Sequence, residues 1–231
     1  MSLFGVPFPP VQVTPADFVG RWSFCDDGWP GSLTLQHTGG EDLSGIYFSE
    51  RFDDDFRVTG RVADGNPHAV ELIVHEFNWL PEQRYSGYLL TRSRNAIAGR
   101  TQWKDQPFGF FATRAARQPL GLYRPGIAQG DDFAGSWTAY LDGETATVVL
   151  AADADAAVLR GSCTVGADGY DVIGTHGAEV PYDIALTMRT RSGGDIVAEL
   201  SGHLMSRPKN AISGVMTAGD AHRGFIMIRY A

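Results

Sequence analysis

The chain has 231 residues, of which 43% are hydrophobic and 11% aromatic, a composition typical of folded globular proteins rather than disordered chains. Its formal net charge of −8 argues against a nucleic-acid-binding surface and against attraction to an anionic membrane. No apolar run approaches the roughly 20 residues that a membrane-spanning helix needs. The first residues lack the basic segment and apolar core of a signal peptide, so we expect a cytoplasmic protein.

Residues 1–16 are rich in proline and predict an extended N-terminal arm. From residue 19 onward, short runs of alternating apolar and polar residues are separated by turn signals such as Asp26-Asp27-Gly28. This pattern indicates β-strands joined by hairpins, and no stretch has the periodicity of a long helix. The strands predicted in the first half span residues 19–25, 31–37, 43–49, 55–62, 69–77, 84–91, 96–104 and 108–114.

Residues 115–131 contain several prolines and glycines and predict a linker. The strands predicted in the second half span residues 134–140, 145–151, 158–165, 169–175, 181–190, 196–205, 211–217 and 223–230. The chain is therefore expected to divide into the arm, a first repeat at 17–114, the linker, and a second repeat at 132–231.

The two halves are copies of one unit. The segment from Tyr85 to Gly99 returns as Leu200 to Gly214, displaced by 115 positions. Eight short antiparallel strands per unit admit a closed barrel or a sandwich, and the whole chain admits one sixteen-stranded barrel. Glycines recur within strands, as at Gly60 and Gly174, where a closing sheet bends. We therefore expect an all-β fold of two tandem eight-stranded antiparallel up-and-down barrels.

Each unit opens with Phe-x-Gly-x-Trp, which contains Trp22 or Trp137, and closes on a strand with Arg114 or Arg229 near its end. This pattern resembles that of the calycins, which include lipocalins, fatty-acid-binding proteins and avidins. The resemblance implies that Trp22 packs under Arg114, and Trp137 under Arg229, so that each barrel is closed at one end. A guanidinium stacked on indole and hydrogen-bonded to carbonyls would stabilise that closure.

Within the first unit, the segments from Leu43 to Ser49 and from Ile97 to Trp103 resemble strands of avidins. The resemblance implies that Tyr47, Ser49 and Trp103 lie along a pocket. Tyr85 stands where avidins have tryptophan, and the second unit has Ser162 at the position of Tyr47. Biotin binding is therefore not carried over.

The aromatic residues are distributed unevenly between the units. The first contains Trp22, Trp29, Trp79 and Trp103, whereas the second contains only Trp137. Aromatic clusters at a barrel mouth bind flat or apolar ligands, although aromatic residues also fill cores. We expect a protein that binds a small apolar or aromatic molecule, with its cavity mainly in the first barrel and with no cofactor. The candidate ligand-binding residues are Tyr47, Ser49, Trp79, Tyr85 and Trp103.

Two other functions stay open. An enzyme that isomerises or cyclises a substrate inside the barrel could use Tyr47, Tyr85 and Arg100 as its polar groups. A structural or interaction module would have solid cores and would bind a protein, or a second copy of itself, through its outer faces.

The remaining clusters have ordinary interpretations. His75 and Glu76 point to opposite faces of a strand, so no metal site is predicted. The basic turns at residues 92–94 and 207–209 could bind an anion, pair with acidic loops of the other barrel, or be solvated turns. The two cysteines do not occupy equivalent repeat positions, so we expect free thiols.

Overall fold

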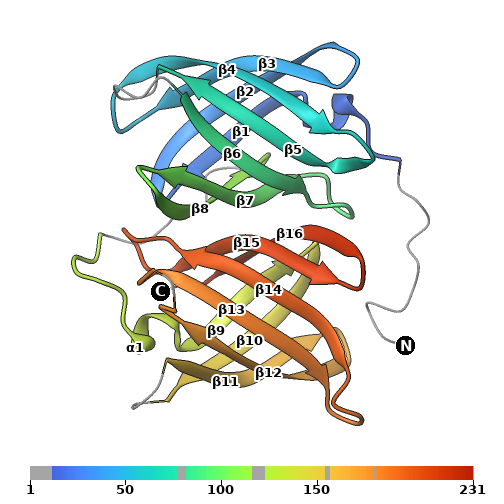
Figure 1. Cartoon of the computed structure of the whole chain (residues 1–231), viewed down its shortest axis with the longest axis vertical. Helices are drawn as coiled ribbons and strands as arrows, with labels where there is room; N and C mark the ends of the chain where they lie inside the picture. Colours follow the sequence, from blue (N-terminus) through green and yellow to red (C-terminus); the bar gives the residue numbers. More distant parts are fainter. Residues whose placement is uncertain (1–11, 77–81, 116–122, 154–156, 179, 231) are drawn as a thin grey trace.

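The computed structural model describes residues 12–76, 82–115, 123–153, 157–178 and 180–230. Two closed barrels, each an antiparallel meander of eight strands, are stacked one above the other (Figure 1). Pairing of β1 with β8 closes the first barrel, and pairing of β9 with β16 closes the second. The tandem-barrel prediction is confirmed, and the sandwich and the single sixteen-stranded barrel are wrong.

All sixteen predicted strands are present, with their ends within three residues of the predicted ones. The first barrel contains β1 (Gly20–Asp26), β2 (Trp29–Gly39), β3 (Asp42–Ser49), β4 (Asp54–Ala63), β5 (Asn66–His75), β6 (Glu82–Leu89), β7 (Ala96–Trp103) and β8 (Gln106–Thr113). The second contains β9 (Gly135–Leu141), β10 (Glu144–Ala152), β11 (Val158–Val165), β12 (Asp168–His176), β13 (Asp183–Thr190), β14 (Ile196–Leu204), β15 (Ala211–Ala218) and β16 (Ala221–Ile228).

Two short helices that we did not predict precede the barrels: η1 (Pro15–Phe18), a 3₁₀ helix, and α1 (Gly130–Phe133). In both, an aspartate in the first turn accepts the backbone N–H three residues earlier, which caps the helix. Each helix ends with a buried phenylalanine whose carbonyl accepts the indole N–H of the first-strand tryptophan at 2.9 Å. The helices therefore fix the tryptophans that plug one end of each barrel.

An arginine covers each of these tryptophans. The Arg114 guanidinium lies 4.0 Å from the Trp22 ring centre, and Arg229 lies 4.8 Å from that of Trp137. Arg114 also donates to the carbonyl of Asp17 at 2.6 Å. Both indoles are fully buried. Each arginine therefore covers a buried ring through a cation–π contact, and it also donates hydrogen bonds to backbone carbonyls.

Mid-strand glycines let neighbouring strands approach closely. A Cβ atom on Gly99 would lie 2.1 Å from the carbonyl oxygen of Ser86, and one on Gly214 would lie 2.1 Å from that of Ser201. These distances are far below any allowed contact, so a side chain would force the strands apart. The glycines therefore allow the tight coiling that closes each sheet.

The barrels contact each other through β6, β7 and β8 on one side and β14, β15 and β16 on the other. Asp27, in the turn after β1, accepts the Ser206 backbone N–H at 2.6 Å and also the Ser206 hydroxyl. Asp142, at the equivalent turn, accepts the Thr91 backbone N–H at 2.7 Å and the Thr91 hydroxyl. Asp142 is displaced from Asp27 by the repeat length of 115, and Ser206 is displaced from Thr91 by the same number, so the interface has approximate twofold symmetry.

Candidate functional site

The end of the first barrel opposite the Trp22 plug contains a cavity of about 70 Å³. It opens where β1 and β7 end and where β2, β6 and β8 begin, and its volume corresponds to about two water molecules. The residues that line it are Asp26, Asp27, Trp29, Arg51, Gln83, Trp103 and Phe108. We call this cavity the first-barrel mouth.

Asp26 is part of the floor of the mouth. It follows Trp22 and Phe24 on the inward face of β1 and is 9% exposed. The Tyr85 hydroxyl donates to its Oδ2 at 3.0 Å. Burial, with a smaller effect from the adjacent Asp27 charge, raises the pKa of Asp26 to about 7. Near neutral pH this carboxyl therefore exchanges between its charged and uncharged forms.

Gln83 lies beside it on the inward face of β6 and is 2% exposed. Its Nε2 donates to the Thr101 hydroxyl at 3.2 Å, and that hydroxyl donates to the Arg84 carbonyl at 2.6 Å. Because Thr101 has a single hydroxyl hydrogen, it can only accept from Gln83, which fixes the orientation of the amide. Gln83 Oε1 is buried and accepts no hydrogen bond from the described residues. A buried acceptor without a donor costs about 1–3 kcal/mol.

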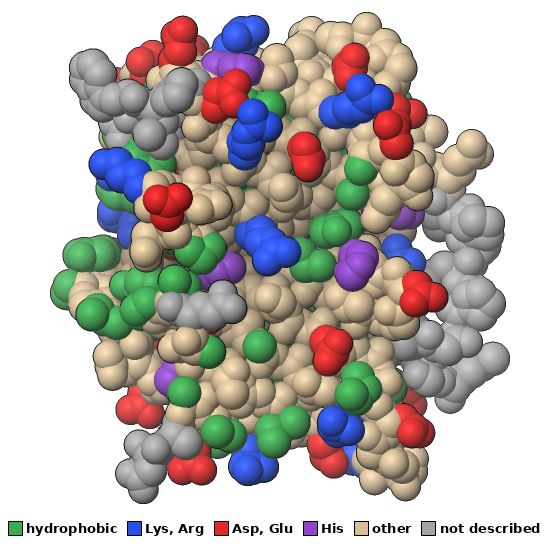
Figure 2. Space-filling view, viewed as in Figure 1, with side chains coloured by type: hydrophobic (Ala, Val, Ile, Leu, Met, Phe, Trp, Pro, Cys, Tyr) green, Lys and Arg blue, Asp and Glu red, His purple; other side chains and the backbone are tan. Residues whose placement is uncertain are grey.

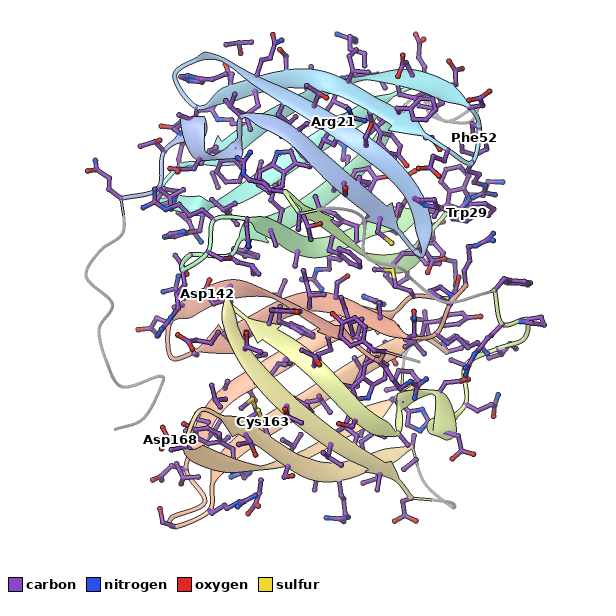
Figure 3. All side chains as sticks on the ribbon, turned by 180° about the vertical axis from the view of Figure 1, so that it is seen from behind. Arg21, Trp29, Phe52, Asp142, Cys163 and Asp168 are labelled. Atoms are coloured by element: carbon purple, nitrogen blue, oxygen red, sulfur yellow. The ribbon has the colours of Figure 1, made fainter. Side chains whose placement is uncertain are left out.

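Aromatic and basic side chains form the rim. The Arg51 guanidinium lies 4.5 Å from the Trp29 ring centre and 4.9 Å from that of Phe52. Arg207, from the second barrel, lies 3.4 Å from Trp29. Figure 3 shows Trp29 and Phe52 at the same end of the first barrel. The rim thus combines aromatic and cationic side chains, and Trp103 lies on the cavity wall.

Asp27 connects the mouth to the second barrel. Its carboxylate lines the cavity and accepts both hydrogen bonds from Ser206. Burial raises the pKa of Asp27 to about 6, and the Ser206 hydrogen bonds oppose that rise. The wall of the mouth is therefore held in place by the contact between the barrels.

Of the predicted ligand-binding residues that the structure describes, some lie at the mouth and others lie in the core of the first barrel. Trp103 lines the mouth, and Tyr85 lies beneath it through its bond to Asp26. Tyr47 belongs to the solid core, with its ring 5.1 Å from that of Phe24, and Ser49 is buried as well, so neither side chain lines the mouth. Trp79 lies outside the described residues. We did not predict Asp26, Gln83 or Arg51. The alternation of inward and outward side chains along β1 and β6 could have identified the first two, because each lies two residues from an inward-facing aromatic residue.

The second barrel has apolar residues at the equivalent positions. The residues that replace Asp26, Gln83, Tyr85 and Thr101 are Leu141, Ala198, Leu200 and Met216. All four are buried in the second core. The assignment of Ser162 to the Tyr47 position is wrong: Tyr47 pairs with Leu33, and Cys163 pairs with Val148, the repeat of Leu33. Cys163 is a buried free thiol whose pKa burial raises to about 12.

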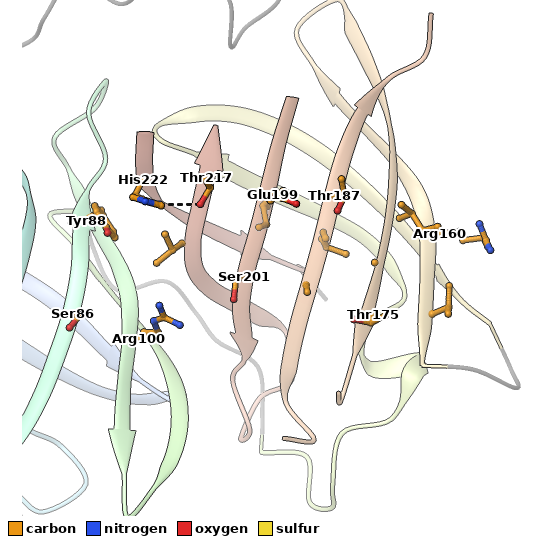
Figure 4. A pocket seen from close by; sticks show the side chains of 17 residues that line it. Ser86, Tyr88, Arg100, Arg160, Thr175, Thr187, Glu199, Ser201, Thr217 and His222 are labelled. Carbon is orange, nitrogen blue, oxygen red and sulfur yellow. Dashed lines mark hydrogen bonds between the residues drawn. The ribbon is translucent and has the colours of Figure 1, made fainter. Parts of the chain in front are cut away.

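Arg100 does not face the barrel interior. The expectation that it could serve as a polar group for catalysis inside the barrel is therefore wrong. Its neighbour Thr101 points inward, and Arg100 lines a groove of about 810 Å³ on the outer surface. Figure 4 shows Arg100 and Tyr88 on the first-barrel side of this groove, with Thr217 and His222 on the other. On the face in Figure 2, acidic and basic side chains are interspersed, so it presents no extended field of one sign.

The basic turns are paired with acids. Arg92 forms an ion pair with Glu144 of the second barrel, whereas Arg94 pairs with Asp17 of its own barrel at 2.9 Å. His75 hydrogen-bonds to Thr59. The described part of the chain contains no group of three metal-ligating side chains. None of its helices has the length and apolar character needed to span a bilayer.

Comparisons with known proteins were also made. No protein-family model matches the chain, and no curated protein matches it at a significant level. A solved structure of a protein with unknown function from the DUF3598 family of Nostoc punctiforme is similar to it at 12% identity, over 92% of this chain and 95% of that one. The TM-score is 0.31, a value too low to support any argument about shared function.

Proposed function

We propose that this protein binds a small molecule at the first-barrel mouth. The observation that supports the proposal is the difference between two copies of one fold. The first copy buries Asp26 and Gln83 beside an opening, and the second copy has Leu141 and Ala198 there.

The difference has a physical meaning because buried polar groups are costly. An ionised or unpaired polar side chain loses its hydration when it enters a core. The second barrel closes with the same strand order and with carbon at these positions, so the fold does not require the polar set. Positions that cost stability and are unnecessary for folding are typical of functional sites.

The size of the mouth limits what can enter. Benzene binds in a protein cavity of about 150 Å³, and this cavity measures only about 70 Å³. Only a head group of a few heavy atoms fits inside. The apolar or aromatic remainder of the ligand would lie at the rim against Trp103, because flat rings stack on indole and the guanidinium groups of Arg51 and Arg207 already lie against Trp29. The ligand is therefore amphipathic, rather than an apolar molecule enclosed in the barrel.

A screen of small aromatic metabolites by native mass spectrometry and thermal shift tests the proposal. The double variant Asp26→Leu/Gln83→Ala installs the residues of the second barrel and should abolish binding while keeping the fold. Met216→Leu, a volume-conserving change in the second barrel, is the matched control and should bind as the wild type does. Ligands that stabilise the double variant as much as the wild type would disprove the site.

A second candidate function is catalysis at the same mouth. A carboxyl whose pKa lies near 7 and that is hydrogen-bonded to Tyr85 is suited to general acid–base chemistry. NMR spectroscopy of the bound molecule before and after incubation distinguishes the two functions, because an isomerisation changes the spectrum while leaving the mass unchanged. A ligand recovered chemically unchanged identifies a binding protein, and a changed one that depends on Asp26 identifies an enzyme.

A further inference from the structure

We propose that the ligand inserts a planar nitrogen group with at least two N–H donors, of the amide, urea or amidinium class, into the first-barrel mouth. This inference rests on the proposed function and specifies the chemistry of its site. It follows from two acceptor side chains that line the mouth: the Gln83 amide, whose oxygen accepts no hydrogen bond from the described residues, and the Asp26 carboxyl.

The first acceptor is Gln83 Oε1. Thr101 uses its only hydroxyl hydrogen on the Arg84 carbonyl, so the Gln83 amide must direct its nitrogen at Thr101 and its oxygen elsewhere. The side chain is 98% buried, given its 2% exposure, and it lines the cavity. A group that enters the mouth and satisfies this oxygen must be a donor.

The second acceptor is the Asp26 carboxyl. Tyr85 donates its single hydroxyl hydrogen to Oδ2, and none of the described residues hydrogen-bonds to Oδ1. Tyr85 is therefore committed as a donor and cannot also donate to a ligand. Two acceptor side chains from separate strands, Asp26 on β1 and Gln83 on β6, thus line one small cavity. A planar group with two N–H bonds can satisfy both at once, whereas a single hydroxyl cannot.

The rim carries the opposite chemistry. Arg51 is exposed and its guanidinium is stacked on Trp29 and Phe52. A carboxylate ligand could contact this cation from outside but would bring its negative charge against Asp26 at the floor. Anion recognition by Arg51 is therefore the rival outcome that the experiment must separate.

Four probes that share one ring test the inference on the full chain: benzamidinium, benzamide, benzoate and toluene. Affinities are measured by ligand-observed NMR near pH 8, where Asp26 is largely ionised. Benzamidinium and benzamide should bind, and benzoate and toluene should bind at least about tenfold more weakly. A preference for benzamidinium over benzamide would identify a cationic ligand, and equal binding a neutral one.

Two variants assign the contacts. Gln83→Met keeps the length of the side chain, removes the acceptor, and should weaken both nitrogen probes by about tenfold or more. Gln36→Met makes the same change at an exposed position of β2 and should have no effect. If Gln83→Met fails to fold, judged by near-ultraviolet circular dichroism, Gln83→Glu replaces it and should favour benzamidinium over benzamide.

The outcomes separate the inference from the proposed function. Tighter binding of benzoate, lost in Arg51→Ala, would overturn the nitrogen-donor inference and leave a ligand site at the mouth. Equal binding of all four probes that survives Gln83→Met would also overturn it. Absence of any ligand at the mouth, for these probes and for the wider screen, would instead reject the proposed function itself.

Discussion

Replacing Asp26 by asparagine should remove much of the loss of stability that the chain suffers between about pH 4 and pH 7. Burial raises the pKa of this carboxyl from 3.8 to about 7. Below the lower value both folded and unfolded chains hold the proton, so there is no effect. As pH rises through the window, the unfolded chain releases its proton first, and the free energy of unfolding falls. A rise of about three units corresponds to on the order of 4 kcal/mol at and above pH 7.

Urea unfolding followed by tryptophan fluorescence measures this effect, because four of the five tryptophans belong to the first repeat. Asparagine keeps an acceptor for Tyr85, so at about pH 4 the variant and the wild type should have similar stabilities. At about pH 8 the variant should be more stable by a few kcal/mol. Glu71→Gln, a neutralising change at an exposed position, is the control. Parallel profiles for Asp26→Asn and the wild type would refute the reasoning.

Three further changes test other contacts. Tyr85→Phe removes a hydrogen bond that lowers the pKa of Asp26, so NMR titration should show that pKa rising further; an unchanged value would show that the bond does not form. Gly214→Ala places a Cβ atom 2.1 Å from a backbone carbonyl and should cost about 3 kcal/mol or more in urea unfolding. Arg114→Ala removes the cation over Trp22 and its hydrogen bonds to carbonyls, which should cost about 2 kcal/mol, and Arg114→Lys should recover little of it.

The strands could be predicted because their signals are local. Each strand is short, alternates in burial, and is bounded by turn residues, so its position follows from a few consecutive residues. The repeat supported each assignment a second time, because every strand predicted in one half has a counterpart in the other. The helices at Pro15–Phe18 and Gly130–Phe133 were missed because one turn of helix leaves no periodic pattern.

The polar floor was harder to predict. Asp26 stands before Asp27 and Gly28, and a run of two aspartates and a glycine indicates a turn. In the structure β1 continues through Asp26, which therefore keeps the inward direction of Trp22 and Phe24. Comparison of the repeats would have identified the position, because Leu141 replaces it.

The size of the interior could not be predicted from the number of aromatic residues. The Phe24 ring contacts the rings of both Tyr47 and Phe110, and all three are buried in the first barrel. Whether such rings line a space or occupy it depends on how their volumes fit together in three dimensions, which strand alternation does not report. The candidate site is accordingly smaller and more polar than the predicted one.

The equivalent contacts of Asp27 with Ser206 and of Asp142 with Thr91 show that the two barrels are arranged like the subunits of a homodimer, although one polypeptide forms both. In an association of identical subunits, every substitution occurs at two places, and its energetic penalty is doubled. Covalent tandem linkage removes that constraint. One half can retain a destabilising acid at its opening while its twin, with leucine at that position, keeps an uninterrupted hydrocarbon interior and acts as a rigid support.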